Sequence, residues 1–311
     1  MPVSVMRGTE DGTFMVALEQ NGPLRNLLLR VAYDGTDFYG WQIQPQRPTI
    51  QGLLVSALGK VCGEPIEVCG AGRTDAGVHA CGQAANVKLS SPIPCSNLVK
   101  AANHLLPESI RILSSQEAPE NFHARHHAQS KTYRYRIFRG AICPPWRCRY
   151  VFPYPYRLDE SAIERAAKYF QGTLDFRAFA AADGDRDEQT EDVPETTEML
   201  TGNQHLPSQA PFEVRSRSRY EKSCVRTIFS SEAIREGDEL VYTVQGNGFL
   251  RHMVRNIVGT LIETGRGRLA PERIPEILAL GSRSAAGPTA PARGLQLISV
   301  YYPPEVLRIA E

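Results

Sequence analysis

The apolar positions of the chain fall into two successive sets of strand and helix patterns. In the first set, residues 27–33 are rich in Leu and Val and end at the turn signal Asp34-Gly35, which indicates a strand. Thr49 can cap a helix, and apolar residues recur at helical spacing over residues 50–61. The same criteria predict further strands at 66–68, 84–89 and 110–113 and a second helix at 98–106.

The second set begins near residue 131. Glu236-Gly237-Asp238 separates two apolar runs and indicates a hairpin. Seven apolar residues at helical spacing within 250–262 predict a long helix, which would place Arg251 and Arg255 four residues apart on one face. The remaining predictions are strands at 133–138, 227–234, 240–244 and 295–301, a helix at 163–170 that begins after Asp159 or Ser161, and a helix at 274–278.

These patterns predict an α+β fold. Each set combines a few strands with two helices, and the hairpin and short connections favour antiparallel pairing. We expect two similar α/β halves, residues 25–127 and 128–303, that share a largely antiparallel mixed sheet with helices on the outside. Tails at 1–24 and 304–311 would flank them. Residues 181–211 are polar and aperiodic, which indicates a disordered insertion or a long surface loop.

Charge is distributed unevenly along the chain. The 311 residues, of which 42% are hydrophobic, suffice for one large domain or two ordinary ones. Residues 181–211 hold eight acidic side chains and one arginine, a net of −7, so the rest carries +8 although the whole chain carries +1. A charge of +8 can attract a polyanion, although mild positive charge can also serve solubility alone.

Cysteine usage and hydropathy bear on the compartment. The seven cysteines are odd in number and include no CxxC pair, which makes a disulfide framework or a zinc site a poor interpretation. No apolar run reaches the roughly 18 residues of a membrane span, and the N-terminus lacks the features of a secretory signal. We therefore expect a cytoplasmic protein with buried reduced thiols, no metal site and no membrane association.

A glycine-rich loop around Asp75 is the most specific local pattern. Gly70, Gly72 and Gly77 allow turns that a Cβ would resist, and Arg73 lies two residues before the acid. An Asp in such a turn is ordinarily structural, because it hydrogen-bonds its own backbone. Composition alone therefore leaves the purpose of this acid open.

The letters of this loop, GRTDAGVHA at residues 72–80, resemble the active-site motif of the TruA family of tRNA pseudouridine synthases. Four further blocks resemble the family in the same order, so that the likeness covers about residues 25–302 and is far more specific than the loop alone. The blocks are YDGT, GWQ and TIQ within 33–51; NFHAR and KTYRY within 121–135; FLRHMVRN at 249–256; and AGPTAP with GL within 286–295.

The resemblance implies isomerisation of uridine to pseudouridine, in which the N1–C1′ bond breaks, the base turns, and a C5–C1′ bond forms without a cofactor. It makes Asp75 the catalytic nucleophile, because a carboxylate can attack or stabilise a cation at an anomeric carbon. Attack on C1′ and removal of a sugar proton stay open as alternatives. The resemblance also implies that Arg255 forms a salt bridge with Asp75. It further implies that Tyr133 is the active-site tyrosine that packs on the uracil.

Base flipping requires further contacts. The target base must leave its stack to reach the carboxylate, and an arginine plane can fill the gap, which is the role expected of Arg73. We expect Arg125 to contact phosphate or order the site, and Arg251 to join the substrate contacts. A histidine near an active site is more often a hydrogen-bonded structural group, so His79 and His123 receive no catalytic role.

Family membership would further imply ferredoxin/RRM-like halves around a central RNA-binding cleft, and a homodimer. The substrate would be the anticodon stem-loop of tRNA, at positions 38, 39 and 40. The acidic segment 181–211 is extra relative to shorter members. Because its charge would repel RNA, it would project away from the cleft or act as a mobile lid, and its deletion should leave activity intact.

Two other classes of function compete with this interpretation. A catalytically silent RNA-binding module could use the same scaffold, but Asp75, Arg73, Tyr133 and Arg255 are all retained. A nucleoside or sugar-phosphate hydrolase could use the glycine-rich loop to bind phosphate. That class would need a second carboxylate at a recognisable motif or a metal site, and the sequence offers neither.

Overall fold

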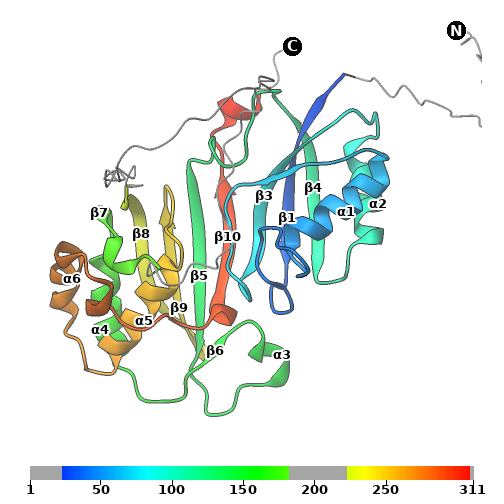
Figure 1. Cartoon of the computed structure of the whole chain (residues 1–311). Coiled ribbons are helices and arrows are strands. Elements are labelled where there is room, and N and C mark those ends of the chain that lie inside the picture. The colour runs from blue at the N-terminus through cyan, green and yellow to red at the C-terminus, as the bar shows by residue number, and fades with distance from the viewer. Residues whose placement is uncertain (1–22, 182–222, 309–311) are drawn as a thin grey trace, which may run out of the picture.

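The computed structural model describes residues 23–181 and 223–308, and its first half combines strands with two helices (Figure 1). Thr49 caps the first helix as predicted, because its side chain accepts a hydrogen bond from the Gly52 N–H. The elements are β1 (Arg25–Tyr33), α1 (Ile50–Cys62), β2 (Val68–Gly70), β3 (His79–Leu89), α2 (Cys95–Leu105) and β4 (Ile110–Ala118).

The second half contains the remaining elements. Of the two candidate caps, Asp159 is the one used, since its side chain accepts from the Ala162 N–H. Gly237 turns the predicted hairpin with a φ of 60°. The elements are β5 (Ser130–Phe138), α3 (Pro145–Cys148), β6 (Phe152–Pro153), α4 (Glu160–Lys168), β7 (Gly172–Asp175), β8 (Val225–Glu236), β9 (Glu239–Gly246), α5 (Met253–Gly265), α6 (Ile274–Leu280) and β10 (Leu295–Tyr301).

Several predicted boundaries were wrong: β4, for example, extends to Ala118 instead of residue 113. Two of the errors lie next to the candidate site. β3 begins at His79 instead of residue 84, because Ala80 and Gln83 already pair with β1 and His79 pairs with β10. α5 begins at Met253 instead of residue 250, because a φ of 61° at His252 interrupts the helical backbone. Arg251 therefore lies outside the helix, and the shared helical face expected for Arg251 and Arg255 does not exist.

One ten-stranded sheet joins the two halves within the described residues. Its order is β4-β1-β3-β10-β5-β9-β8-β7, with β2 beside β3 and β6 beside β5. Only β3–β10 and β5–β6 are parallel, and the other pairs are antiparallel. This confirms the α+β class and the largely antiparallel mixed sheet. The last strand, β10, lies between the halves and pairs with both.

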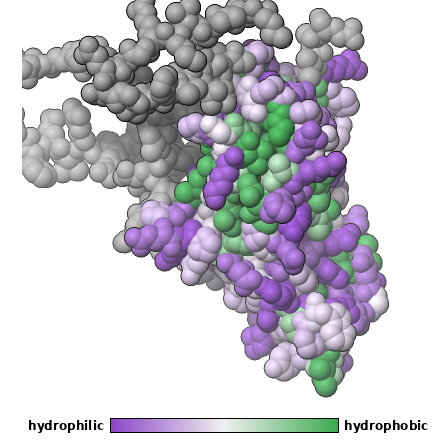
Figure 2. Space-filling view, turned by 90° about the vertical axis from the view of Figure 1, so that its right-hand side faces the viewer, coloured by the Kyte–Doolittle hydropathy of each residue, from purple (hydrophilic) through white to green (hydrophobic). Residues whose placement is uncertain are grey.

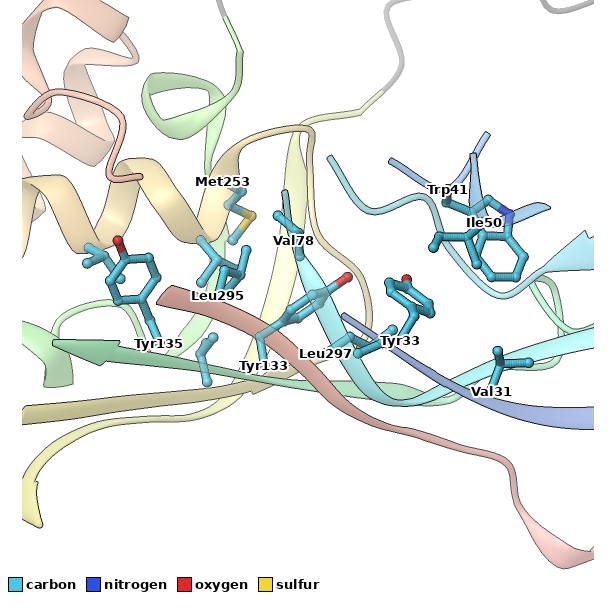
Figure 3. Close-up of a cluster of buried hydrophobic side chains, with 14 of the residues drawn as sticks. Val31, Tyr33, Trp41, Ile50, Val78, Tyr133, Tyr135, Met253, Leu295 and Leu297 are labelled. Carbon is cyan, nitrogen blue, oxygen red and sulfur yellow. The ribbon is translucent and has the colours of Figure 1, made fainter. Parts of the chain in front are cut away.

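The main hydrophobic core covers one face of the sheet and includes residues from both halves. Figure 3 shows Val31 and Tyr33 of β1 on the same side of the sheet as Tyr133 and Tyr135 of β5. The helices α1 and α2 cover the first half, and α4, α5 and α6 cover the second (Figure 1). A smaller cluster on Leu28, Ala84 and Phe122 packs around Tyr302.

Several expectations concern segments at the limits of the structure. Residues 1–22 and 182–211, which include most of the expected tail and insertion, lie outside the described residues. Within the described part, no helix has the length and apolar character needed to cross a bilayer. All seven cysteines are free thiols, but only Cys62 is buried and Cys81 is exposed, so the expectation of buried thiols was wrong for most of them.

Candidate active site

Asp75 lies in the loop of residues 71–78 between β2 and β3, here called the Asp75 loop. The Trp41 N–H donates a hydrogen bond to the Thr74 carbonyl oxygen at 3.0 Å. Gly40 has a φ of 86°, and an added Cβ would lie 2.6 Å from that same oxygen, so only glycine fits at this position. The aromatic segment after β1 therefore holds the backbone next to the acid.

The carboxylate of Asp75 faces two basic side chains. Arg255 Nη1 lies 3.0 Å from Asp75 Oδ2, and His252 Nε2 lies 3.6 Å from the same oxygen. The Asp75 side chain is 25% exposed and that of Arg255 is 16% exposed, so the pair is only partly screened by water. No described residue donates a hydrogen bond to Oδ1, which leaves this oxygen available to a substrate.

The C-terminal block of the sequence fixes Arg255. Arg255 Nε donates to the Ala290 carbonyl oxygen at 2.8 Å, and the Ala290 N–H donates back to the Arg255 carbonyl oxygen at 3.1 Å. This contact requires a close approach of α5 to the segment 286–291. A Cβ on Gly259 would lie 1.6 Å from the Pro288 oxygen, and one on Gly287 would lie 2.7 Å from Thr260. Glycine at these two positions therefore permits the packing that aims Arg255.

Tyr133 is buried on β5 close to Asp75. Its ring meets Phe249 edge to face at a centroid distance of 5.0 Å. Burial, and then the neighbouring Tyr33 and Asp75, raise the pKa of Tyr133, so the phenol keeps its proton at physiological pH. Figure 3 shows the hydroxyl groups of Tyr133 and Tyr33 directed to the same side of the sheet. The Tyr33 hydroxyl is hydrogen-bonded to Thr74 Oγ1 at 2.8 Å.

The other expected site residues have exposed side chains, unlike Arg255 and Tyr133. Arg73 is exposed at the edge of the Asp75 loop, where its Nε donates to Gln42 Oε1 at 3.0 Å. Arg125 is exposed in the segment between β4 and β5. Arg251 is exposed just before α5, and its carbonyl oxygen accepts from the Ala181 N–H. Asp75, Arg255 and Tyr133 are therefore the expected residues that come together.

Two histidines refine the picture of the site. His252, which the sequence reasoning missed, lies beside Asp75, and its position three residues before Arg255 was an available signal. His79 is buried and accepts from the Gly35 N–H at 3.1 Å, and its Nε2 lies 2.9 Å from the Arg149 carbonyl oxygen. Burial lowers the pKa of His79, which agrees with the structural role expected for it.

Known proteins resemble the chain over most of its length. A family model described as tRNA pseudouridine synthase matches residues 30–127 and 209–303, which include Asp75 and Arg255 but not Tyr133. The tRNA pseudouridine synthase A of Solibacter usitatus is 44% identical over 279 residues, or 90% of this chain and 100% of that protein. The proteins of the same name from Halalkalibacterium halodurans and Caldicellulosiruptor bescii are 40% and 37% identical, over 88% and 90% of this chain and 90% and 100% of theirs.

Among solved structures, a chain of a Cbf5-Nop10-Gar1 complex matches 76% of this chain and 54% of its own length. Its sequence identity is 13% and its TM-score 0.27. That similarity is too weak to bear on the fold or the function. Evidence for the fold and the function comes instead from the matched family model and from the relatives that align over their full length.

Proposed function

The chain belongs to the tRNA pseudouridine synthase family, and we propose that it isomerises uridine to pseudouridine in tRNA at a site centred on Asp75. The observation that carries this assignment is the ion pair between Asp75 and Arg255, which joins residues 180 positions apart. A structural acid in a glycine-rich turn would be satisfied by its own backbone. Instead this carboxylate is held by a partly buried arginine from the other half, with Oδ1 left for a ligand.

This geometry supports an isomerisation whose atoms and electrons balance without any further reactant. The uracil N1–C1′ bond breaks, the base turns, the C5–C1′ bond forms, C5 loses its proton to solvent, and N1 gains one. Asp75 acts as the nucleophile at the ribose, where a carboxylate meets the cationic character of the anomeric carbon. Arg255 holds positive charge at the opposite carboxylate oxygen, and His252 Nε2 lies beside that oxygen. The paired carboxylate therefore has a fixed orientation when RNA excludes water.

We assign the substrate contacts to the residues around this carboxylate. The Tyr133 ring, braced by Phe249, offers a face on which the uracil packs. Arg73 projects from the edge of the Asp75 loop and fills the stack that the base leaves. Arg125 contacts a phosphate of the RNA, and Arg251 joins the substrate contacts. The RNA would then cross β3, β10 and β5, in a central cleft between the two helical layers.

We propose that the target uridines are those at positions 38, 39 and 40 of the anticodon stem-loop, and that the enzyme acts in the cytoplasm. The support is the ordered resemblance over residues 25–302 and the full-length similarity to proteins named tRNA pseudouridine synthase A. Pseudouridine mapping in tRNA from a strain lacking the gene tests this. Loss at positions 38–40 is expected, and loss at other positions only would contradict the assignment.

We also propose that the protein acts as a homodimer, a shape that suits an L-shaped substrate. Figure 2 shows an area of apolar residues on the outer side of the first half, bordered by hydrophilic ones. Exposed apolar surface of this kind is often buried between subunits. Light scattering at the enzyme concentration of the assay should give twice the chain mass of 34.5 kDa. The mass of one chain would contradict the proposal.

An assay with tRNA tritiated at uridine C5 separates this function from its alternatives. Isomerisation releases the label to water, so release by the wild-type protein is expected. A catalytically silent RNA-binding module would bind the RNA without release. A hydrolase would instead liberate free uracil, which chromatography of the same reaction detects.

A further inference from the structure

Lys131 is a partly buried lysine beside the Asp75 loop. A Cβ on Gly72 would lie 3.3 Å from Lys131 Nζ, so the ammonium group rests against the loop three residues before Asp75. Lys131 precedes Tyr133 by two residues on β5, in a stretch that pairs with β9 without irregularity, so both side chains point to the same face. The charge of Lys131 therefore belongs to the same side of the sheet as the candidate active site.

The charged groups that act on Lys131 are cations. Burial, and then Arg125 and Arg226, lower the pKa of Lys131 to about 8. Arg226 comes from β8, and its Nη1 is held by the carbonyl oxygens of Ser223 and Val225 at 2.8 and 2.7 Å. Within residues 23–181 and 223–308, no carboxylate forms an ion pair with Lys131. The charges of Arg125 and Arg226, from two other segments, therefore act on Lys131 without a described counter-charge.

Two other partly buried cations of the sheet differ from Lys131 because each is paired with a carboxylate. On the opposite face of β5, Arg136 donates two hydrogen bonds to Glu239, at 2.6 and 2.9 Å. Arg25 of β1 is likewise paired with Glu117. A buried charge is ordinarily paired, because leaving it unpaired costs stability. Lys131 lacks such pairing in the described chain, and a bound anion held with Arg125 and Arg226 would supply it.

We propose that Lys131, Arg125 and Arg226 bind a phosphate of the RNA backbone next to the target uridine. The inference rests on the proposed function, which places the uracil on Tyr133. Successive residues on one face of a strand are about 6.8 Å apart. A nucleotide whose base packs on Tyr133 would therefore bring a flanking phosphate within reach of Lys131. The site would position the flipped nucleotide and carry no sequence information.

The first test measures how RNA affinity depends on salt. Each phosphate contact contributes about 0.7 to 0.9 to the slope of log K against log salt concentration. Lys131→Gln should reduce the slope for tRNA by about that amount relative to wild type. Lys168→Gln, which changes an exposed lysine on α4, is the matched control and should leave the slope unchanged. Equal slopes for wild type and Lys131→Gln would overturn the proposal.

The second test uses stem-loop RNA with a neutral methylphosphonate at one of the two phosphates that flank the target uridine. Wild type should lose affinity at one of these positions, and Lys131→Gln should lose nothing further there. Equal penalties in both proteins at both positions would overturn the site. Thermal melting controls for folding, since removing an unpaired buried cation should not lower Tm. Both readouts are binding, so absence of tritium release by wild type would defeat the proposed function alone.

Discussion

At the residue scale, the two contacts of the Asp75 carboxylate share one oxygen. Arg255 and His252 both face Oδ2, and Arg255 is held in turn by the Ala290 carbonyl oxygen. The guanidinium therefore cannot swing away when RNA displaces water from the site. An electrostatic group that is fixed before the reaction needs no reorganisation during it. We infer that Arg255 contributes to turnover more than to RNA affinity.

Replacing Arg255 separates its charge from its geometry. Arg255→Met should lower the single-turnover rate by on the order of 10²-fold, because a preorganised charge at the carboxylate is lost. Arg255→Lys keeps a charge but not the fork that reaches both Asp75 and Ala290, so it should retain more activity. Arg273→Met, in an exposed pair with Glu276, is the control. A rate for Arg255→Met within about twofold of wild type would show that the ion pair is dispensable.

Lys131 gives RNA binding a pH dependence of known sign. Its pKa of about 8 in the folded protein lies below the unfolded value near 10.4, so the unfolded chain binds more protons between these pH values. Below pH 8, burying the charged Lys131 therefore lowers the free energy of unfolding. This destabilisation disappears as the pH rises to about 10. In the folded protein, the charge of Lys131 that is available to phosphate is lost as the pH rises through about 8.

The expected result is a loss of RNA affinity as the pH rises from 7 to 9. Lys131→Gln should show a smaller loss, because the titrating group is gone. Fluorescence anisotropy with a labelled stem-loop at fixed ionic strength measures both proteins. Bound phosphate favours the protonated lysine, so the midpoint in the complex should lie above pH 8. Parallel pH profiles for the two proteins would rule out Lys131 as the source.

At the scale of elements, the decisive contact is between α5 and the segment 286–291. Gly259 and Gly287 let the segment approach the helix backbone, and Ala290 then holds Arg255. Arg283 and Thr289 also bond the side-chain oxygen of Asn256 on α5. The C-terminal block thus acts on the site through the helix, without touching Asp75 itself.

The variant Gly259→Ala tests this contact, because close packing and helix propensity predict opposite effects on stability. Propensity alone predicts that Ala in a helix interior stabilises the protein by about 1 kcal/mol. The added Cβ would lie 1.6 Å from the Pro288 oxygen, so we expect the opposite, a lower Tm and a slower turnover. Thermal melting and the single-turnover assay measure the two effects. A variant as stable and active as wild type would show that the segment can move away without disturbing Arg255.

The elements that could be predicted from the sequence are those with local signals. Thr49, Asp159 and Gly237 mark their boundaries by side-chain capping or a turn, and each does so in the structure. The start of β3 depends instead on pairing with β1, and the start of α5 on a positive φ at His252. Neither leaves a periodic trace in the apolar residues. Local pattern therefore identified most of the elements, but it missed α3, β6 and β7 and the ends that shape the site.

The candidate site shows the same limit. Asp75, Arg255 and Tyr133 could be selected because whole blocks of sequence resembled a family, not because of their spacing. The contacts of Ala290 with Arg255 and of Lys131 with the Asp75 loop join residues far apart in the chain. No single-sequence signal reports such proximity. The functions of the individual residues stay predictions until variants are measured.

At the scale of the whole molecule, the candidate site exists only where the two halves meet. Asp75 comes from the first half, and Tyr133 and Arg255 come from the second. Strand β10 unites them by pairing in parallel with β3 and antiparallel with β5. One continuous sheet thus fixes the distance between the carboxylate and its partners. Activity would then be a property of the joined sheet and not of either half, residues 25–127 or 128–303, alone.

The most direct test of the account compares wild type with Asp75→Asn on tRNA tritiated at uridine C5. Asn has nearly the shape of Asp but no negative charge, so RNA binding should persist while the chemistry stops. We predict release of tritium to water by wild type and none above the enzyme-free background by Asp75→Asn, with both proteins shown to bind the RNA. Release by Asp75→Asn at a rate near that of wild type would contradict the central role given to this carboxylate.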